Sequence, residues 1–297
     1  MELQLWNQIV QLLVTHDNSP FNPWQTYTNV RIAAIWFWGV LHDRSVSWSV
    51  DSKNWPIHLR KQPLPCNGTM SERLKTNEVK ELIQQVENQV VKSSGEKPLY
   101  WMMDGKPFPI GGASKDRQAG YGRAVRGKAR GYKVHAITGS DGSLAAWRVA
   151  PMNQDERTIA RRLLRDAEIQ GYLLADGNYD SNPLHHWCES KGNLQFVTPP
   201  RGGLGKKKRR KKMSDGRRRS LDLLENPVSD FGLSLLDERR EIERHFGNWT
   251  NWGGGLTGLP PWVRTHVRVR RWIQAKLIIQ LVKHPPKQRE RTKVVKA

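Results

Sequence analysis

The spacing of apolar residues changes at about residue 97, and this change limits the folds open to the chain. Before it, apolar residues recur at helical intervals in residues 3–15 and 79–90, and residues 28–42 are apolar almost throughout. Breaks rich in Asn, Ser, Pro and Gly separate these segments. We therefore predict an all-helical N-terminal region over residues 1–95, made of several short helices.

After residue 97, short apolar runs alternate with helical patterns. Strands are predicted at 99–103, 132–138, 144–150, 172–175 and 194–197, and helices at 155–167, 183–191, 233–248 and 272–282. Asp141-Gly142 marks a hairpin turn, and the glycine-rich, basic residues 111–131 are expected to form a loop. This order predicts an α/β domain over residues 97–284, with a mixed sheet flanked by helices.

The chain is strongly basic, with 49 Lys and Arg against 28 Asp and Glu and a formal net charge of +21. Such an excess favours a polyanionic partner, with nucleic acid first and an anionic membrane second. Residues 201–219 hold eleven Lys and Arg and one Asp, yet the rest of the chain keeps a net +11 (+21 less +10). This basic loop is either a solubilising surface patch or a flexible arm that neutralises phosphates, and a basic tail follows at 285–297.

Several protein classes are disfavoured. No apolar run approaches the roughly 20 residues that cross a bilayer, and residues 1–16 lack the basic start and cleavage site of a secretion signal. The cysteines, Cys66 and Cys188, are far apart, so a structural zinc site is not expected. These patterns favour a reducing, cytoplasmic compartment without a membrane partner.

Three acidic residues stand out because of the elements that carry them. Asp104-Gly105 and Asp176-Gly177 each follow an apolar strand, and Glu243 lies in a segment of helical period. Asp-Gly is also common in turns, and Glu243 could be a surface acid paired with Arg239. If the sheet brings the three carboxylates together, they could hold divalent metal against a nucleic-acid phosphate.

The phase of the helical pattern predicts where Glu243 points. Leu236, Arg239, Glu243 and Phe246 fall on one side of a helix over residues 233–248. We therefore expect Glu243 to face the protein interior, where an unpaired carboxylate would be costly.

Four motifs together resemble a DDE-type bacterial insertion-sequence transposase with a ribonuclease H-like catalytic domain. They are MDGKPFPIG (103–111), GYKVHAITGSDG (131–142), LLADGNYDS (173–181) and RREIERHFGNW (239–249). By matching motif positions, Asp104, Asp176 and Glu243 resemble the three catalytic acids. Arg239 matches the arginine of the signature around the glutamate, whereas Leu236 and Thr250 replace its tyrosine and its lysine.

The resemblance implies cleavage of element ends and transfer of the freed 3′-OH to target DNA. It implies two Mg²⁺ ions per site, or Mn²⁺ in their place, with Asp104 and Asp176 holding one and Asp104 and Glu243 the other. The expected partner is double-stranded DNA, bound by a homodimer or larger synaptic complex associated with the nucleoid. We assign phosphate contacts to Arg239, Arg244, Lys128, Arg130, Lys206, Lys207, Lys208, Arg209 and Arg210.

Four residues in the matching motifs are assigned supporting roles: His135, Asn178, Tyr179 and Asp180. His135 could instead be an ordinary histidine of the sheet, and Asp180 would replace Asp176 if Asp176 only formed a turn. Two other functions stay open: a metal-dependent nuclease or inactive transposase copy, and a non-enzymatic nucleic-acid-binding protein. The N-terminal helices are compatible with a DNA-binding helix-turn-helix or with a dimerisation module.

Overall fold

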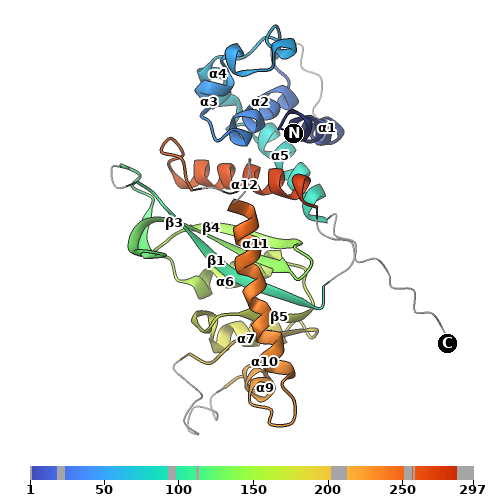
Figure 1. The fold of residues 1–297 in the computed structure, drawn as a ribbon, viewed down its shortest axis with the longest axis vertical. Coiled ribbons are helices and arrows are strands. Elements are labelled where there is room, and N and C mark those ends of the chain that lie inside the picture. The colour runs from blue at the N-terminus through green and yellow to red at the C-terminus, as the bar shows by residue number, and fades with distance from the viewer. Residues whose placement is uncertain are drawn as a thin grey trace, which may run out of the picture. The chain divides into compact units, whose positions relative to one another are not determined.

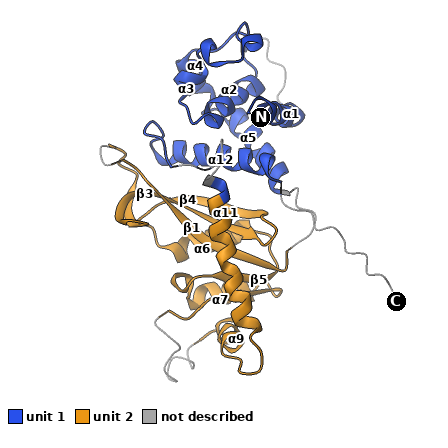
Figure 2. Cartoon of the chain, in the orientation of Figure 1, with its two compact units in different colours: residues 1–93, 248–285 blue, residues 94–247, 286–297 orange. Residues whose placement is uncertain are grey.

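A computed structural model describes residues 2–18, 24–92, 98–111, 114–201, 213–250, 256 and 258–285. The chain forms two compact units, shown in different colours in Figure 2. Unit 1 comprises residues 1–93 and 248–285, and unit 2 comprises residues 94–247 and 286–297. This division differs from the one we drew from the sequence, because residues 248–284, which we placed in the α/β domain, group with the N-terminal helices.

Unit 1 is helical, as the apolar spacing predicts. Its main helices are α1 (Glu2–His16), α2 (Asn29–Leu41), α3 (Val46–Ser49), α4 (Asn67–Arg73), α5 (Asn77–Lys92) and α12 (His266–Lys283). Eleven of the thirteen residues of α2 are buried, because α1, α5 and α12 all pack against it. Tryptophans fill much of this core: the rings of Trp38 and Trp55 are stacked with centroids 4.9 Å apart.

Two buried polar contacts tie α12 to the N-terminal helices. The Lys276 side chain is 0% exposed, and its Nζ lies 2.5 Å from Oδ1 of Asp43, just after α2. Gln274 Nε2 donates to Glu87 Oε2 on α5 at 2.6 Å. Buried polar groups need such partners, so these contacts explain why a C-terminal helix completes the N-terminal unit.

Unit 2 is built on a six-stranded mixed sheet (Figure 1). Its strands are β1 (Tyr100–Pro109), β2 (Gly120–Ala124), β3 (Gly127–Gly139), β4 (Leu144–Pro151), β5 (Gly171–Ala175) and β6 (Leu194–Val197). The order is β2-β3-β1-β5-β6, and β4 pairs with β3. β1 runs antiparallel to β3 and parallel to β5, and β5 runs parallel to β6. This mixed α/β sheet, flanked by helices and preceded by a helical region, confirms the predicted class and is consistent with a ribonuclease H-like fold.

Helices cover both faces of this sheet. On one face, α6 (Glu156–Asp166) and α7 (Asn182–Glu189) bury a core that includes Trp101 and Met103 of β1. On the other face, α10 (Phe231–Asp237) packs against β5, and after a 3-10 turn at Glu238–Arg240, α11 (Glu241–Thr250) crosses β1, as Figure 1 shows. Tyr100 donates from its hydroxyl to Glu238 Oε2 at 2.8 Å, and Lys106 donates to the Phe246 carbonyl at 3.2 Å.

Three local expectations are wrong. β1 does not end before Asp104 but continues to Pro109, and the expected loop at 111–131 contains β2 and the start of β3. The basic loop predicted at 201–219 includes the first half of α9 (Asp215–Leu224). Among the described residues, no helix is long and apolar enough to span a membrane.

Candidate active site

Asp104 lies in the middle of β1, where it pairs with Ala136 of β3. The following glycine does not form a turn. A Cβ on Gly105 would lie 2.6 Å from Lys133 Cδ and 3.0 Å from His135 Nδ1, so a larger residue would force these two side chains to shift. Since side chains alternate along a strand, Asp104 shares a sheet face with Tyr100 and Lys106, both of which contact the α10–α11 segment.

Asp176 follows β5 directly, as the sequence predicts, and parallel pairing places it beside Asp104. Met103 pairs with Ala175, so the two aspartates come one residue later on neighbouring strands. Asp176 Oδ1 accepts the Asn178 backbone N–H at 2.9 Å, and Oδ2 accepts from Asn178 Nδ2 at 3.0 Å. The Thr198 hydroxyl donates to the Asp176 carbonyl at 2.7 Å. Asn178 and Thr198 therefore fix the second acid in place.

The two aspartates interact electrostatically. Burial raises the pKa of Asp104 to about 6, and the nearby Asp176 and Glu156 carboxylates add to this rise. The Gly105 N–H, which donates to Asp104 Oδ1 at 2.7 Å, and the Arg239 guanidinium act in the opposite direction. The net rise shows that the positive charge around Asp104 does not compensate its ionised form. A cation bound here would supply the missing charge.

Glu243 is exposed on α11, so our expectation that it points into the protein is wrong. The buried face of α11 consists instead of Ile242, His245, Phe246 and Trp249, and His245 Nδ1 lies 3.0 Å from the Thr138 hydroxyl of β3. Among the described residues, no group of three His, Cys, Asp or Glu side chains is close enough to hold an ion. The structure thus brings Asp104 and Asp176 together and leaves Glu243 on the helix that crosses their sheet face.

Two further side chains belong to the surroundings of Asp104, and neither is among the site residues predicted from the sequence. Glu156, in the first turn of α6, contributes to the raised pKa of Asp104 and forms an ion pair with Lys133. Lys133 is the residue that crowds Gly105. The only sequence feature that could have marked Lys133 as a site residue is its position inside the GYKVH motif. Glu156 looked like an ordinary acid at the start of a helix.

The supporting residues take up different positions. Burial lowers the pKa of His135 to about 3, with Lys133 adding to the shift, so this histidine is neutral; its Nδ1 lies 3.5 Å from the Tyr179 hydroxyl. Tyr179 is fully buried, and burial, together with Glu156, Asp104 and Asp176, raises its pKa well above the usual value. The uncharged Tyr179 therefore lies near the two aspartates, and the uncharged His135 lies beside Tyr179.

Asp180 has a structural role that makes it a poor substitute for Asp176. It is buried, its Oδ2 lies 2.5 Å from Arg217 Nη2 on α9, and it accepts the Arg201 backbone N–H at 2.9 Å. Burial alone would raise the pKa of Asp180, but the contacts with His185, Arg201 and Arg217 hold it below its usual value. Asp180 therefore holds α9 against the sheet as a permanently ionised anchor.

The predicted phosphate contacts differ in how available they are. Arg239 is half-buried and acts on the pKa of Asp104, which places its guanidinium near the acids. Arg244 is exposed and paired with Glu241, and the Lys128 ammonium lies 5.9 Å from the Tyr121 ring. Arg130 donates to the Ala119 and Asp116 carbonyls, so much of its donor capacity is used within the protein. Lys206, Lys207, Lys208, Arg209 and Arg210 lie outside the described residues.

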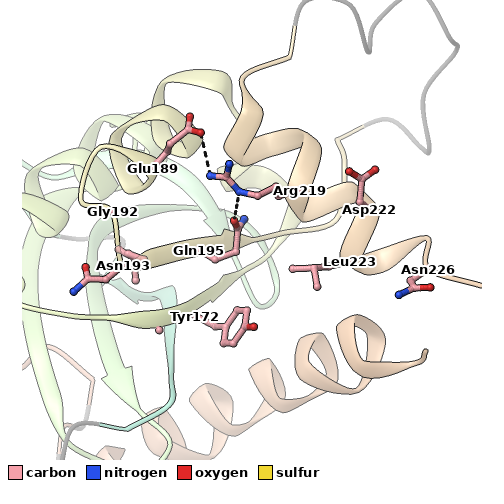
Figure 3. A pocket seen from close by; sticks show the side chains of 11 residues that line it. Tyr172, Glu189, Gly192, Asn193, Gln195, Arg219, Asp222, Leu223 and Asn226 are labelled. Atoms are coloured by element: carbon pink, nitrogen blue, oxygen red, sulfur yellow. Dashed lines mark hydrogen bonds and ion pairs between the residues drawn. The ribbon is translucent and has the colours of Figure 1, made fainter. Parts of the chain in front are cut away.

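A pocket of about 860 Å³ lies at the other ends of β5 and β6, lined by Gly171, Tyr172 and Leu194 among others. Figure 3 shows Arg219 directed toward Glu189 and Gln195 at this pocket. Its guanidinium donates to Glu189 Oε1 at 3.0 Å and to Gln195 Oε1 at 3.1 Å. Because Asp176 follows the last residue of β5 and the pocket surrounds the first, this pocket is separate from the candidate active site.

Comparison with known families gives a match. The model of the transposase DDE domain matches residues 101–279, more than half of the chain, and this range contains Asp104, Asp176 and Glu243. A comparison with curated proteins gave no match. The chain therefore belongs to the DDE transposase family, as the four motifs had suggested.

Proposed function

We propose that this DDE transposase cuts DNA at the ends of a mobile element and joins the freed 3′-OH to target DNA. Membership of the family supports cleavage of phosphodiester bonds in general. The observation that carries the finer proposal is the pairing of Asp104 and Asp176 on adjacent parallel strands. Two neighbouring carboxylates, one with a raised pKa, suit a divalent cation.

The residues fit a metal site in part. Asp104 and Asp176, which end up on neighbouring strands, would be two ligands, and Glu243 would be the third, approaching from α11. Mg²⁺ takes only one or two carboxylates and keeps several waters, so a loosely placed third acid is compatible with it. Bound Mg²⁺ or Mn²⁺, two ions per site, would stabilise charge on the attacking and leaving oxygens and activate the attacking water.

The side chains around the acids have their own tasks. Arg239, near Asp104, would hold the phosphate that is being cut, because guanidinium pairs well with phosphate oxygens. The buried, neutral His135 and Tyr179 give the acids a rigid base that does not compete for a cation. The same acids would serve both cutting and joining, so no covalent bond between protein and DNA is needed.

The DNA partner accounts for the basic character of the chain. The β2–β3 hairpin with Lys128, and the segment 201–219, would follow the DNA backbone through sequence-independent contacts. Because joining requires two element ends held together, we expect a homodimer or larger assembly in the synaptic complex, acting in the cytoplasm on the nucleoid.

Cleavage and joining on DNA that carries candidate element ends test the proposal. Wild-type protein should release a 3′-OH and join it to target DNA when Mg²⁺ or Mn²⁺ is present, and Asp104→Asn should do neither. Asp141→Asn is a matched control, because Asp141 also precedes a glycine but lies in the β3–β4 turn, where its Oδ1 accepts from Ser143. Its activity should stay near that of the wild type.

Two outcomes would identify the other functions. Cutting without joining, lost in Asp104→Asn, would indicate a nuclease or an inactive copy of a transposase. DNA binding that persists with no cutting in any variant, and no divalent-cation binding that depends on Asp104, would indicate a non-enzymatic DNA-binding protein and overturn the proposal.

A further inference from the structure

Unit 1 contains a cavity of about 490 Å³ between α2, the α3–α4 region and the start of α12. Its walls include Trp36, Trp262, Lys75, Arg268 and Arg271, together with three serines and an asparagine. None of the described residues that line it is an Asp or Glu. The cavity therefore combines positive charge, hydrogen-bond donors and indole surface.

Arg268 and Arg271 lie close together without a neutralising partner. Neither guanidinium contacts a carboxylate or a carbonyl in the described part of the chain. Burial lowers the pKa of Arg271, and the neighbouring Arg268 lowers it further. Arg271 is half-buried and loses hydration, whereas Arg268 is exposed beside it. The two like charges repel each other, so an anion held between them would stabilise unit 1.

The rest of α12 shows that the fold can neutralise a buried cation. Lys276, two turns further along the helix, is paired with Asp43 at 2.5 Å. Lys75, at the cavity, is paired with Glu72 at 2.8 Å. Arg271 differs from Lys276 in this respect, because it is half-buried with no carboxylate partner among the described residues, and it lines the cavity together with Arg268.

Two more features suit an anion. The first residues of α12, an 18-residue helix, line the cavity, and the N-terminal end of a helix carries partial positive charge. Trp36 is 8% exposed, and its indole N–H has no acceptor among the described residues. Trp262, 41% exposed, offers a flat apolar surface at the same cavity.

We propose that this cavity binds a backbone phosphate of DNA, with Arg268 and Arg271 on the phosphate and Trp262 against the adjacent sugar or base. The inference rests on the proposed function, because that function makes DNA the polyanion the protein must hold. It gives unit 1 a DNA contact that does not involve the catalytic acids. A phosphate pairs with two guanidinium groups through charge-assisted hydrogen bonds, and it would neutralise the positive charge of Arg268 and Arg271.

Binding of a fluorescent DNA duplex of about 20 base pairs and arbitrary sequence tests the site in the full-length protein. Arg268→Gln and Arg271→Gln should each weaken binding about tenfold and reduce the slope of log K against log salt concentration by about 1. Arg270→Gln is the matched control, because Arg270 is exposed on the same helix between the two arginines and does not line the cavity. It should change the slope much less.

Thermal unfolding tests whether a variant binds DNA more weakly only because it is less stable. Arg271→Gln removes a poorly hydrated charge, so it should unfold at the same temperature as the wild type or higher. The inference is overturned if Arg268→Gln and Arg271→Gln bind DNA no more weakly than Arg270→Gln. It is also overturned if the loss appears with an RNA duplex but not with DNA.

The catalytic assay separates this inference from the proposed function. If wild-type protein binds DNA through Arg268 and Arg271 but never cuts it, the cavity assignment stands and the proposed function fails. If wild-type protein cuts and joins DNA while the three arginine variants bind it equally, the proposed function stands and the cavity assignment fails.

Discussion

Both units bring like charges together, but the charges have opposite sign. In unit 2, Asp104 and Asp176 lie side by side, and burial raises the pKa of Asp104 to about 6. In unit 1, Arg268 and Arg271 share a cavity that no described carboxylate lines. Two other buried charges in the described residues are neutralised, Lys276 by Asp43 and Asp180 by Arg217. The contrast supports the two proposed ligands, a cation in unit 2 and an anion in unit 1.

The two places also differ in rigidity. Asp104 sits on a strand that is hydrogen-bonded on both sides, by β3 and β5, so its backbone position is fixed. The guanidinium groups of Arg268 and Arg271 lie at the ends of long side chains on α12, and such side chains can adjust to their ligand. Bond cleavage depends on geometry far more than phosphate binding does. The comparison therefore predicts large effects of substitutions at the acids and graded effects at the arginines.

The largest effect is expected from neutralising the acids. Asp104→Asn and Asp176→Asn should each reduce cleavage of element-end DNA by about 10³-fold or more, because each removes a charge that would hold the cation. DNA binding, measured without divalent cations, should change little. Cleavage within about tenfold of the wild type in either variant would refute the assignment of the carboxylate pair.

A smaller but still large effect is expected at Glu243. Glu243→Gln should lower cleavage about 10²-fold if this acid closes the site from α11. Glu241→Gln makes the same change two residues away, at an acid that is paired with Arg244, and should cost less than about threefold. Equal losses in both variants would show that the charge of α11 matters and the position of Glu243 does not.

Breaking a neutralised pair should affect stability, and not DNA binding. Asp43→Asn leaves the Lys276 ammonium, which is 0% exposed, without its carboxylate, so unfolding free energy should fall by about 2 kcal/mol. Glu72→Gln, which breaks the exposed pair with Lys75, should cost less than about 0.5 kcal/mol. Urea unfolding measures both. A stable Asp43→Asn protein would mean that unit 1 tolerates unpaired buried cations, which would remove the contrast with Arg268 and Arg271.

The raised pKa of Asp104 predicts how cation binding depends on pH. Below about pH 6 the folded protein holds a proton on Asp104, and a cation must displace it. Calorimetric affinity for Mn²⁺ should therefore be constant above about pH 7 and fall by up to about tenfold per pH unit below about 6. The Asp141→Asn control should follow the same curve. An affinity that does not change down to about pH 5 would contradict the role given to Asp104.

The smallest effect concerns stability without metal. Because the pKa of Asp104 is higher in the folded protein, ionisation costs stability as pH rises from about 4 to about 6, and the full cost applies above that. Asp104→Asn should therefore stabilise the metal-free protein by about 1–3 kcal/mol near pH 8 and change it little near pH 4. Thermal unfolding in a chelator measures this. An Asp104→Asn protein less stable than the wild type near pH 8 would mean that the carboxylate is well compensated.

The sequence predicted the sheet because its evidence was local: apolar runs, helical spacing and a turn dipeptide lie within a few residues. It placed Asp176 correctly for the same reason. It missed the continuation of β1 through Asp104-Gly105, since the need for glycine comes from Lys133 and His135 on another strand. Local patterns do not show such contacts across strands.

The error at Glu243 has a different cause. The expected face ran from Leu236 to Phe246 as one helix, but a 3-10 turn at Glu238–Arg240 lies between α10 and α11 and changes the phase. The buried face then restarts at Ile242, and Glu243 falls beside it. Sequence patterns also did not predict the cavity lined by Arg268 and Arg271, because its walls come from segments about 190 residues apart in the chain.

The division of unit 1 between both ends of the chain has a consequence for synthesis. Residues 1–93 leave the ribosome 155 residues before residue 248 (248 less 93), and the catalytic sheet is made in that interval. At typical translation rates the delay is about 8–30 s. During it the apolar surfaces of α2 and α5 that α12 later covers are left open. A chain that stops early can thus complete its catalytic sheet but never closes unit 1, and must rely on chaperones to stay out of aggregates.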